Sequence, residues 1–363
     1  MFIYRLLICC TLFLINSENL FSQSFSIKGQ LWLSSLTGDN IPSDISSVES
    51  NIGYIPTVSL FKNLENNKFL DLEFSYQLNR IYSGDSLMTD DNDFYRYWIR
   101  YSTDKLEARL GLQKIVFGPS QVLSSLFWFD SVDLQDPKEQ VNGVEALRIR
   151  WYPSNLVSLW TWVINEDENM SFGGRGELSS NIGEWGLSWH KHSKESFLDL
   201  GGFGNIVPMD SPIRIGIDYR YDGFVGFWNE NSMLNSDNFD LLNSTLGADY
   251  TLPIFNGILI MGEYMFLSSE FNDETENKTS MAFMASTPIG MIHQLMFISS
   301  IELDENRKYN HLRWTSTYDD YSMNFILSEN PERIEYDELE KEYLPNTISA
   351  NGLSFQIMFI YNH

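Results

Sequence analysis

The sequence predicts an all-β fold, a transmembrane antiparallel up-and-down β-barrel of about 18 strands, with 16 as the alternative count. Polar and apolar side chains alternate in segments of about ten residues. The connections between these segments alternate along the chain between short turns and longer polar loops. A soluble β-sandwich or propeller would not show this alternation of loop lengths. Aromatic residues make up 15% of the chain. Such a composition is typical of strands with one face toward lipid and one toward water.

A secretory signal peptide is expected at residues 1–23, and the barrel at residues 24–363. Arg5 precedes an apolar run at 6–15. This run of about ten residues is too short for a membrane helix, which needs about 20. Both cysteines, Cys9 and Cys10, fall in this segment. The mature chain is therefore expected to have no disulfide and no cysteine-based zinc site.

The overall charge restricts the kinds of partner. The chain has 24 Lys and Arg against 49 Asp and Glu, a formal net charge of −25. This charge argues against a nucleic acid as the main ligand. No later apolar run approaches the length of a spanning helix. A membrane form of the chain would therefore be a barrel.

The clearest strand is 70–79, where five apolar side chains alternate with five polar ones. Strands are expected at 25–34, 51–62, 70–79, 93–101, 105–113, 145–151, 156–164, 170–178, 184–191, 213–220, 223–229, 239–252, 257–268, 278–287, 291–301, 308–318, 321–328 and 353–361. Short turns are expected at 103–104, 153–155, 221–223, 253–256, 288–290 and 319–320. Residues 193–211 are interpreted as a loop, and 329–347 as a long acidic loop.

Arginines occupy one face of neighbouring central strands, opposite the residues that can face lipid. A charge in hydrocarbon costs about 2–4 kcal/mol at the bilayer midplane, so this face is predicted to point inward. The predicted basic wall consists of Arg96, Arg100, Arg109, Arg148, Arg150 and Arg175.

Residues 115–142, after the fifth strand, are too long for a hairpin loop, and their apolar content argues against disorder. We expect this segment to fold into the barrel and bring acidic side chains toward the arginines. Opposed rows of charge across a constriction create a field that orients dipolar solutes. The alternative is that these charges only satisfy a polar interior. The loop side of the predicted constriction consists of Trp128, Asp130, Asp133 and Asp136, and Glu139 lies nearby.

The aromatic run of the loop has two interpretations. Phe127, Trp128 and Phe129 could anchor the loop on the wall, or they could form a stacking surface for sugar rings. Anchoring is the favoured interpretation.

No catalytic constellation is visible, so the chain is not expected to be an enzyme. His190 and His192 share a face at a strand end, where a solvated pair is favoured over a metal site. We expect no metal and no cofactor.

Several central residues resemble porin-like outer-membrane proteins of Bacteroidetes. These are Gly111 to Ile115, Phe117-Gly118, Leu126, Trp128 to Asp130 and Asp136-Pro137. The loop after the fifth strand also resembles the channel-narrowing loop of general and sugar porins. The chain departs from the porin pattern at its end, which reads Tyr361-Asn362-His363 and so lacks a terminal aromatic residue. The resemblance covers the central third of the chain, and the remainder only through its strand rhythm.

The resemblance implies a porin in the outer membrane of a Gram-negative cell that allows passive diffusion of small hydrophilic solutes, and often a homotrimer. Its surroundings would be outer-membrane lipid and lipopolysaccharide. From the residues themselves, we expect a lumen narrowed by the loop at 115–142. The alternative is a plugged barrel that acts as a structural or accessory subunit of a larger complex. The acidic net charge favours cations and the arginines favour anions, so the selectivity is not readable.

Overall fold

The computed structural model describes residues 23–39, 41, 46–129, 136–138, 140–141, 143–166, 169–192, 196–199, 206–209, 211–237, 239–271, 274–331, 348 and 351–363. The predicted signal peptide lies outside the described residues, apart from Gln23 at the start of β1. Most of the predicted acidic loop at 329–347 also lies outside them.

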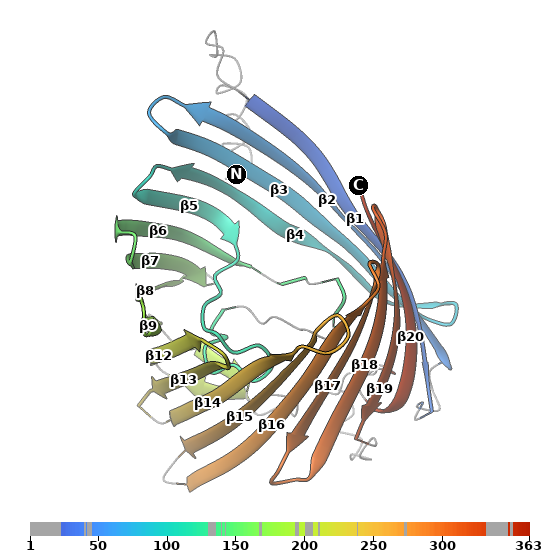
Figure 1. The fold of residues 1–363 in the computed structure, drawn as a ribbon. Helices are drawn as coiled ribbons and strands as arrows, with labels where there is room; N and C mark the ends of the chain where they lie inside the picture. Colours follow the sequence, from blue (N-terminus) through green and yellow to red (C-terminus); the bar gives the residue numbers. More distant parts are fainter. Residues whose placement is uncertain are drawn as a thin grey trace.

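Eighteen strands form one closed antiparallel barrel, which confirms the predicted fold class (Figure 1). Consecutive barrel strands pair with each other, β9 pairs with β12, and β1 pairs with both β2 and β20, so the sheet has no free edge. The strands of the first half are β1 (Gln23–Gly38), β2 (Val48–Leu64), β3 (Lys68–Ser83), β4 (Ser86–Ser102), β5 (Leu106–Gln113), β6 (Val144–Ser154), β7 (Val157–Glu166), β8 (Asn169–Ser180) and β9 (Gly183–Lys191). The second half has β12 (Ile213–Asp222), β13 (Gly226–Asn235), β14 (Phe239–Leu252), β15 (Ile258–Phe271), β16 (Glu274–Ile289), β17 (His293–Glu302), β18 (Arg307–Thr317), β19 (Tyr321–Asn330) and β20 (Gly352–Asn362).

Two further strands lie outside the barrel sheet. β10 (Ser196–Asp199) and β11 (Ile206–Met209) pair only with each other, within the connection between β9 and β12. The predicted loop at 193–211 therefore contains a small hairpin, which adds no strand to the barrel.

One rim of the barrel has short connections throughout, as the alternation of loop lengths predicts, whereas the opposite rim has short connections as well as long ones, for example at 84–85 and 236–238. All six predicted short turns join strands at the first rim, and so does the turn between β2 and β3. In that turn Asn66 and Asn67 have φ of 60° and 55°. Positive φ at two successive residues is typical of the hairpin turn that matches strand twist, and Asn tolerates it. The longest connections, including that between β5 and β6, lie at the opposite rim.

Several hairpins are longer than the sequence predicts: β13 continues to Asn235 beyond the predicted 229, and β15 to Phe271 beyond the predicted 268. β3 and β4 continue to Ser83 and Ser86, although residues 86–92 are not predicted as strand. The extension of β4 lacks the alternation of polar and apolar residues, because the apolar Leu87 and Met88 are consecutive and residues 89–92 are polar on both faces. A cross-strand ion pair between Arg80 and Asp90, at 3.2 Å, joins its two strands.

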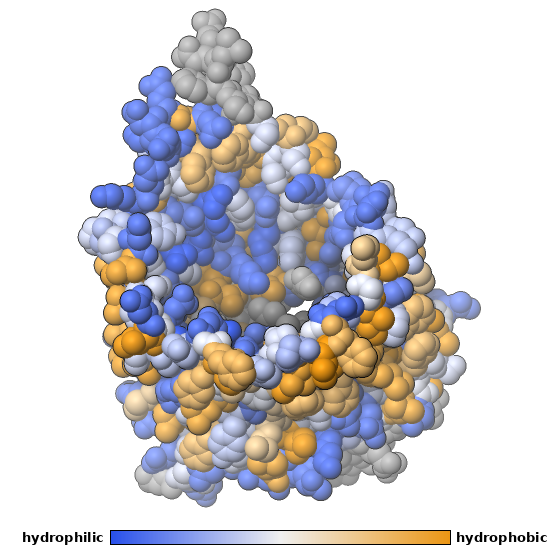
Figure 2. Space-filling model, in the orientation of Figure 1, coloured by the Kyte–Doolittle hydropathy of each residue, from blue (hydrophilic) through white to orange (hydrophobic). Residues whose placement is uncertain are grey.

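The alternation places apolar side chains outside and polar ones inside. On β9, Trp185, Leu187 and Trp189 are exposed on the outer face, whereas Ser188 and His190 are fully buried inside. The end of the barrel seen in Figure 2 is hollowed, and mainly hydrophilic residues line the hollow. Within the described residues, no helix is long and apolar enough to cross a membrane.

Candidate functional site

The connection between β5 and β6 runs into the barrel and reaches strands on another part of the wall (Figure 1). We call residues 115–142 the inner loop. Its contacts centre on two carboxylates, Glu230 of β13 and Glu263 of β15, which are 0% and 4% exposed. The donors are the main-chain N–H groups of Ser120, Gln121, Val122, Leu123 and Ser125 and the hydroxyl of Ser124, at 2.6 to 3.0 Å.

These two carboxylates are functional residues that the sequence analysis does not single out. The alternation places Glu230 and Glu263 on inward positions of their strands, and this was the only signal available. Except for the Ser124 hydroxyl, their partners are main-chain N–H groups, which every residue except proline has. The sequence therefore does not show which carboxylates hold the loop.

An aromatic cluster fixes the next part of the inner loop. The ring of Phe117 lies 5.3 Å from that of Trp128 and 5.8 Å from that of Trp162 on β7, measured between centroids. Trp128 Nε1 also donates to Ser232 Oγ of β13 at 3.2 Å. Phe129 packs edge-on against His190, at 4.9 Å between centroids. These are the contacts of an anchor, the favoured interpretation of the aromatic run, and the predicted pore-lining function of Trp128 stays a prediction.

The part of the inner loop that returns to β6 is held by side chains of β1 and β4. Gln140 Nε2 donates to Gln30 Oε1 of β1 at 3.0 Å. The main-chain N–H of Val141 donates to the Tyr95 hydroxyl at 3.3 Å, and the Val141 carbonyl accepts from the Arg96 guanidinium. The described inner loop is thus fixed at both limbs and at its middle.

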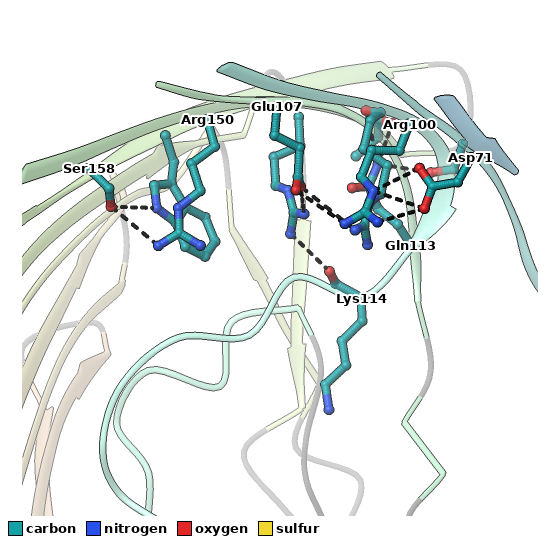
Figure 3. A network of polar contacts seen from close by, with 12 residues as sticks. Asp71, Arg100, Glu107, Gln113, Lys114, Arg150 and Ser158 are labelled. Carbon is teal, nitrogen blue, oxygen red and sulfur yellow. Dashed lines mark hydrogen bonds and ion pairs between the residues drawn. The ribbon is translucent and has the colours of Figure 1, made fainter. Parts of the chain in front are cut away.

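Three arginines of the predicted basic wall share one carboxylate. Glu107 of β5 lies 2.8 Å from Arg148 Nη2, 3.3 Å from Arg100 Nη1 and 3.7 Å from Arg109 Nη2. Arg100 also forms a bidentate pair with Asp71 of β3, at 2.6 Å for the shortest contact. Figure 3 shows Asp71, Arg100 and Glu107 projecting from the wall on the side of the inner loop.

A second group continues along the wall. Glu177 of β8 lies 2.8 Å from Arg150 and 2.9 Å from Arg175. Arg175 also pairs with Asp218 of β12 at 2.6 Å. Over both groups, five arginines meet four carboxylates, Asp71, Glu107, Glu177 and Asp218. The sixth arginine of the predicted wall, Arg96, donates instead to the main-chain carbonyls of Tyr95 and Val141. The arginines of the predicted wall thus outnumber the carboxylates that pair with them, although the chain as a whole is acidic.

The six arginines differ in their access to the lumen. Arg96, Arg148 and Arg175 are buried, and each contacts the inner loop or its root. The side chains of Arg100, Arg109 and Arg150 are 26%, 17% and 29% exposed. The guanidinium of Arg109 lies 4.4 Å from the ring centroid of Trp98, and that of Arg150 lies 4.1 Å from that of Trp160. Aromatic faces thus supplement the carboxylates as partners of these cations.

The described acidic partners of these arginines come from the wall. The sequence analysis expects acidic residues of the inner loop to approach them, but Asp136 pairs with Lys138 of the same loop at 3.2 Å. Asp130, Asp133 and Glu139 lie outside the described residues. Inward positions of the wall itself supply Asp71, Glu107, Glu177 and Asp218, close to the arginines through strand pairing.

The predicted solvated histidine pair is buried instead. His190 is fully buried and His192 nearly so, because the aromatic cluster of the inner loop covers them. Trp162 Nε1 donates to His190 Nδ1 at 3.1 Å. Among the residues with assigned positions, no group of three or more His, Cys, Asp or Glu side chains could hold a metal ion.

The arrangement resembles solved outer-membrane barrels in fold. OmpT of Vibrio cholerae, an outer membrane protein folded in vitro, superposes with a TM-score of 0.53 at 10% identity, over 96% of this chain and 100% of that one. The same protein expressed in the outer membrane gives a TM-score of 0.50 at 10% identity, over 94% and 98%. An anion-selective porin from Comamonas acidovorans gives 0.48 at 12% identity, over 94% and 100%. No family model and no curated protein sequence matches the chain. At these identities the likeness establishes the fold alone.

Proposed function

We propose that the chain is an outer-membrane porin, through which small hydrophilic solutes diffuse passively. The observation that carries the proposal is the inner loop, which enters the barrel and docks on Glu230 and Glu263 through main-chain hydrogen bonds. A loop fixed in this way narrows the lumen without needing to fill it. The outer-membrane barrels of the same fold support the location.

The narrow part of the proposed channel has one basic side. Arg100, Arg109 and Arg150 keep part of their guanidinium surface exposed on the wall. Anions passing along this wall would meet a positive potential, which favours them over cations of the same size. We therefore propose weak anion preference at the wall, despite the net charge of −25.

The apolar outer surface of the barrel indicates which environment the proposed porin would have. The apolar outward side chains would contact acyl chains, and the rim of longer connections would face the outside of the cell. One solved barrel of the same fold is described as a trimer form of OmpT, at 10% identity and a TM-score of 0.52. We propose that several copies of this chain also assemble in the membrane.

Liposome swelling tests the proposed diffusion. The refolded barrel is inserted into vesicles that enclose an impermeant polymer, and the vesicles are diluted into isotonic sugar, amino acid or salt solutions. We expect swelling whose rate falls with solute size. Vesicles that contain the folded barrel but do not swell in any solute would contradict the proposal and favour the plugged barrel.

A further inference from the structure

Polar side chains lie on the outer face of the barrel at the middle of its wall. Asn229 and Asn231 of β13 alternate with the inward residues Trp228 and Glu230, and both asparagines therefore point outward. Ser244 of β14 pairs in register with Asn231 and also points outward. We call Asn229, Asn231 and Ser244 the asparagine patch.

The patch is one hydrogen-bonded group. Asn231 Nδ2 donates to Asn229 Oδ1 at 2.5 Å, and Ser244 Oγ donates to Asn231 Oδ1 at 2.7 Å. Asn229 Nδ2 donates to the main-chain carbonyl of Thr245 at 2.9 Å. Each of the two amide nitrogens has two hydrogens and uses one of them in these bonds. Both asparagines thus keep a donor for a further partner.

The surroundings of the patch are apolar. In the register of the sheet, Asn231 lies beside Ile217 of β12, and Asn229 lies beside Leu246 of β14. Ser244 lies beside Phe266 of β15. Asn231 is the sixth of the ten residues of β13, so the patch lies far from both rims. A polar headgroup cannot reach this depth, and an amide hydrogen that faces acyl chains lacks a partner at a considerable cost.

The outer face is apolar on both sides of the patch. Toward β9, the outward side chains of Leu187, Ile215 and Ile217 are 57%, 51% and 47% exposed. Toward β17 lies an apolar groove of about 470 Å³, whose floor includes Ala248 and Gly262. The groove exists because these residues place little or no side chain on the surface. In Figure 1 the strands from β9 to β17 follow one another along one side of the barrel.

We propose that the outer surface from β9 to β17 is the contact between copies of the chain. In this assembly the asparagine patch would lie nearest the symmetry axis that relates the copies. An amide is both donor and acceptor, so the same patch on a second copy supplies the missing partners. Exposed apolar side chains of one copy would pack into the groove of its neighbour, where small residues permit close approach. A lipid chain could fill the groove, but it would leave the amides unpaired. The inference rests on the proposed membrane location.

Cross-linking between identical positions tests the proposal. The described residues contain no cysteine, so Asn231→Cys in the predicted mature chain introduces a single reporter. The matched control is Leu327→Cys on β19, an outward position 42% exposed on another part of the barrel. Under mild oxidation in vesicles, we expect a disulfide-linked dimer as the main product with Asn231→Cys. With the control we expect a much lower yield of dimer. Absence of the dimer with Asn231→Cys, or equal yields for both variants, would overturn the proposal.

A second variant keeps the proposal testable if the cysteine geometry is unfavourable. Asn231→Leu places a lipid-compatible side chain on the outer face, so the barrel should insert and conduct as before. We expect its mass in mild detergent to fall from that of an oligomer to that of a single chain. An unchanged oligomer, or a wild-type barrel that conducts as a single chain, would overturn the inference and leave the proposed function intact. A wild-type barrel that neither swells vesicles nor conducts would overturn the proposed function instead.

Discussion

Glu230 of β13 accepts a hydrogen bond from the main-chain N–H of Ser120 at 2.8 Å, inside the barrel and far from the strands that begin and end the inner loop. The carboxylate also accepts from Ser125 and from the Ser124 hydroxyl. Glu263 accepts three further main-chain N–H groups. The position of the inner loop across the lumen therefore depends on two wall carboxylates.

Replacing one of these carboxylates should release the middle of the inner loop. Glu230→Gln keeps the shape of the side chain but turns an amide N–H₂ toward N–H donors. Losing charged hydrogen bonds of this kind costs about 1–3 kcal/mol. We expect faster cleavage of the loop by an added protease, with the barrel still folded. Glu276→Gln, an exposed residue of β16, is the control, and equal cleavage of both variants would contradict the assigned role.

The aromatic anchor should contribute measurable stability. Trp128→Ala removes the ring that packs on Phe117 and also the bond to Ser232. We expect a loss of about 3 kcal/mol in the free energy of unfolding, near the lower end for large core aromatics. Trp128→Phe keeps a ring and loses the hydrogen bond, for which about 1 kcal/mol is expected. Urea titration of the barrel in vesicles measures both, and similar losses for the two variants would argue against packing as the main contribution.

The negative charge of Glu107 should lower the positive electrostatic potential at the arginine wall. It is the shared partner of Arg100, Arg109 and Arg148. Glu107→Gln removes one negative charge and leaves those arginines with fewer ionic contacts, so anion preference should increase. The reversal potential in a salt gradient measures this change. Asp90→Asn, in the extension of the β3–β4 hairpin, is the control, and a shift toward cations in Glu107→Gln would contradict the assignment.

Removing an exposed arginine should have the opposite effect. Arg109 has one ionic contact, with Glu107 at 3.7 Å, and part of its surface faces the lumen. Arg109→Gln should therefore shift the reversal potential toward cations with little loss of stability. Arg80→Gln changes the same charge on the β3–β4 hairpin, away from the wall. An effect of Arg80→Gln as large as that of Arg109→Gln would show that overall charge, and not the wall, sets the preference.

The sequence was sufficient for the barrel because lipid and water impose a period of two on every strand. The alternation at 70–79 and the inward placement of Arg100 and Arg109 both follow from that rule. The rule gives no signal where polar residues occupy both faces of a strand, as they do at 89–92 of β4 and at 230–232 of β13, so these parts of the two strands were missed. The predicted resemblance to porins agrees with the fold, whereas an origin in Bacteroidetes stays a prediction.

The partners inside the barrel were less accessible to prediction. Glu230 and Glu263 bind main-chain groups, which leave no pattern in the sequence. The burial of His190 and His192 depends on where the inner loop docks, and the loop docks through contacts between distant segments. The ion pairs of the arginines were predicted with loop residues, but wall residues such as Glu107 are nearer through strand pairing. Pairing between strands is readable only once their register is known.

Single-channel recording tests the central claim most directly, namely that the inner loop narrows an open lumen without closing it. The folded barrel is added to a planar bilayer, alone and as a variant whose inner loop lacks residues 120–125. We predict stepwise ohmic openings for the wild type and a larger conductance for the shortened loop. A bilayer that stays sealed with correctly inserted wild-type barrel, or an equal conductance for both proteins, would contradict the account.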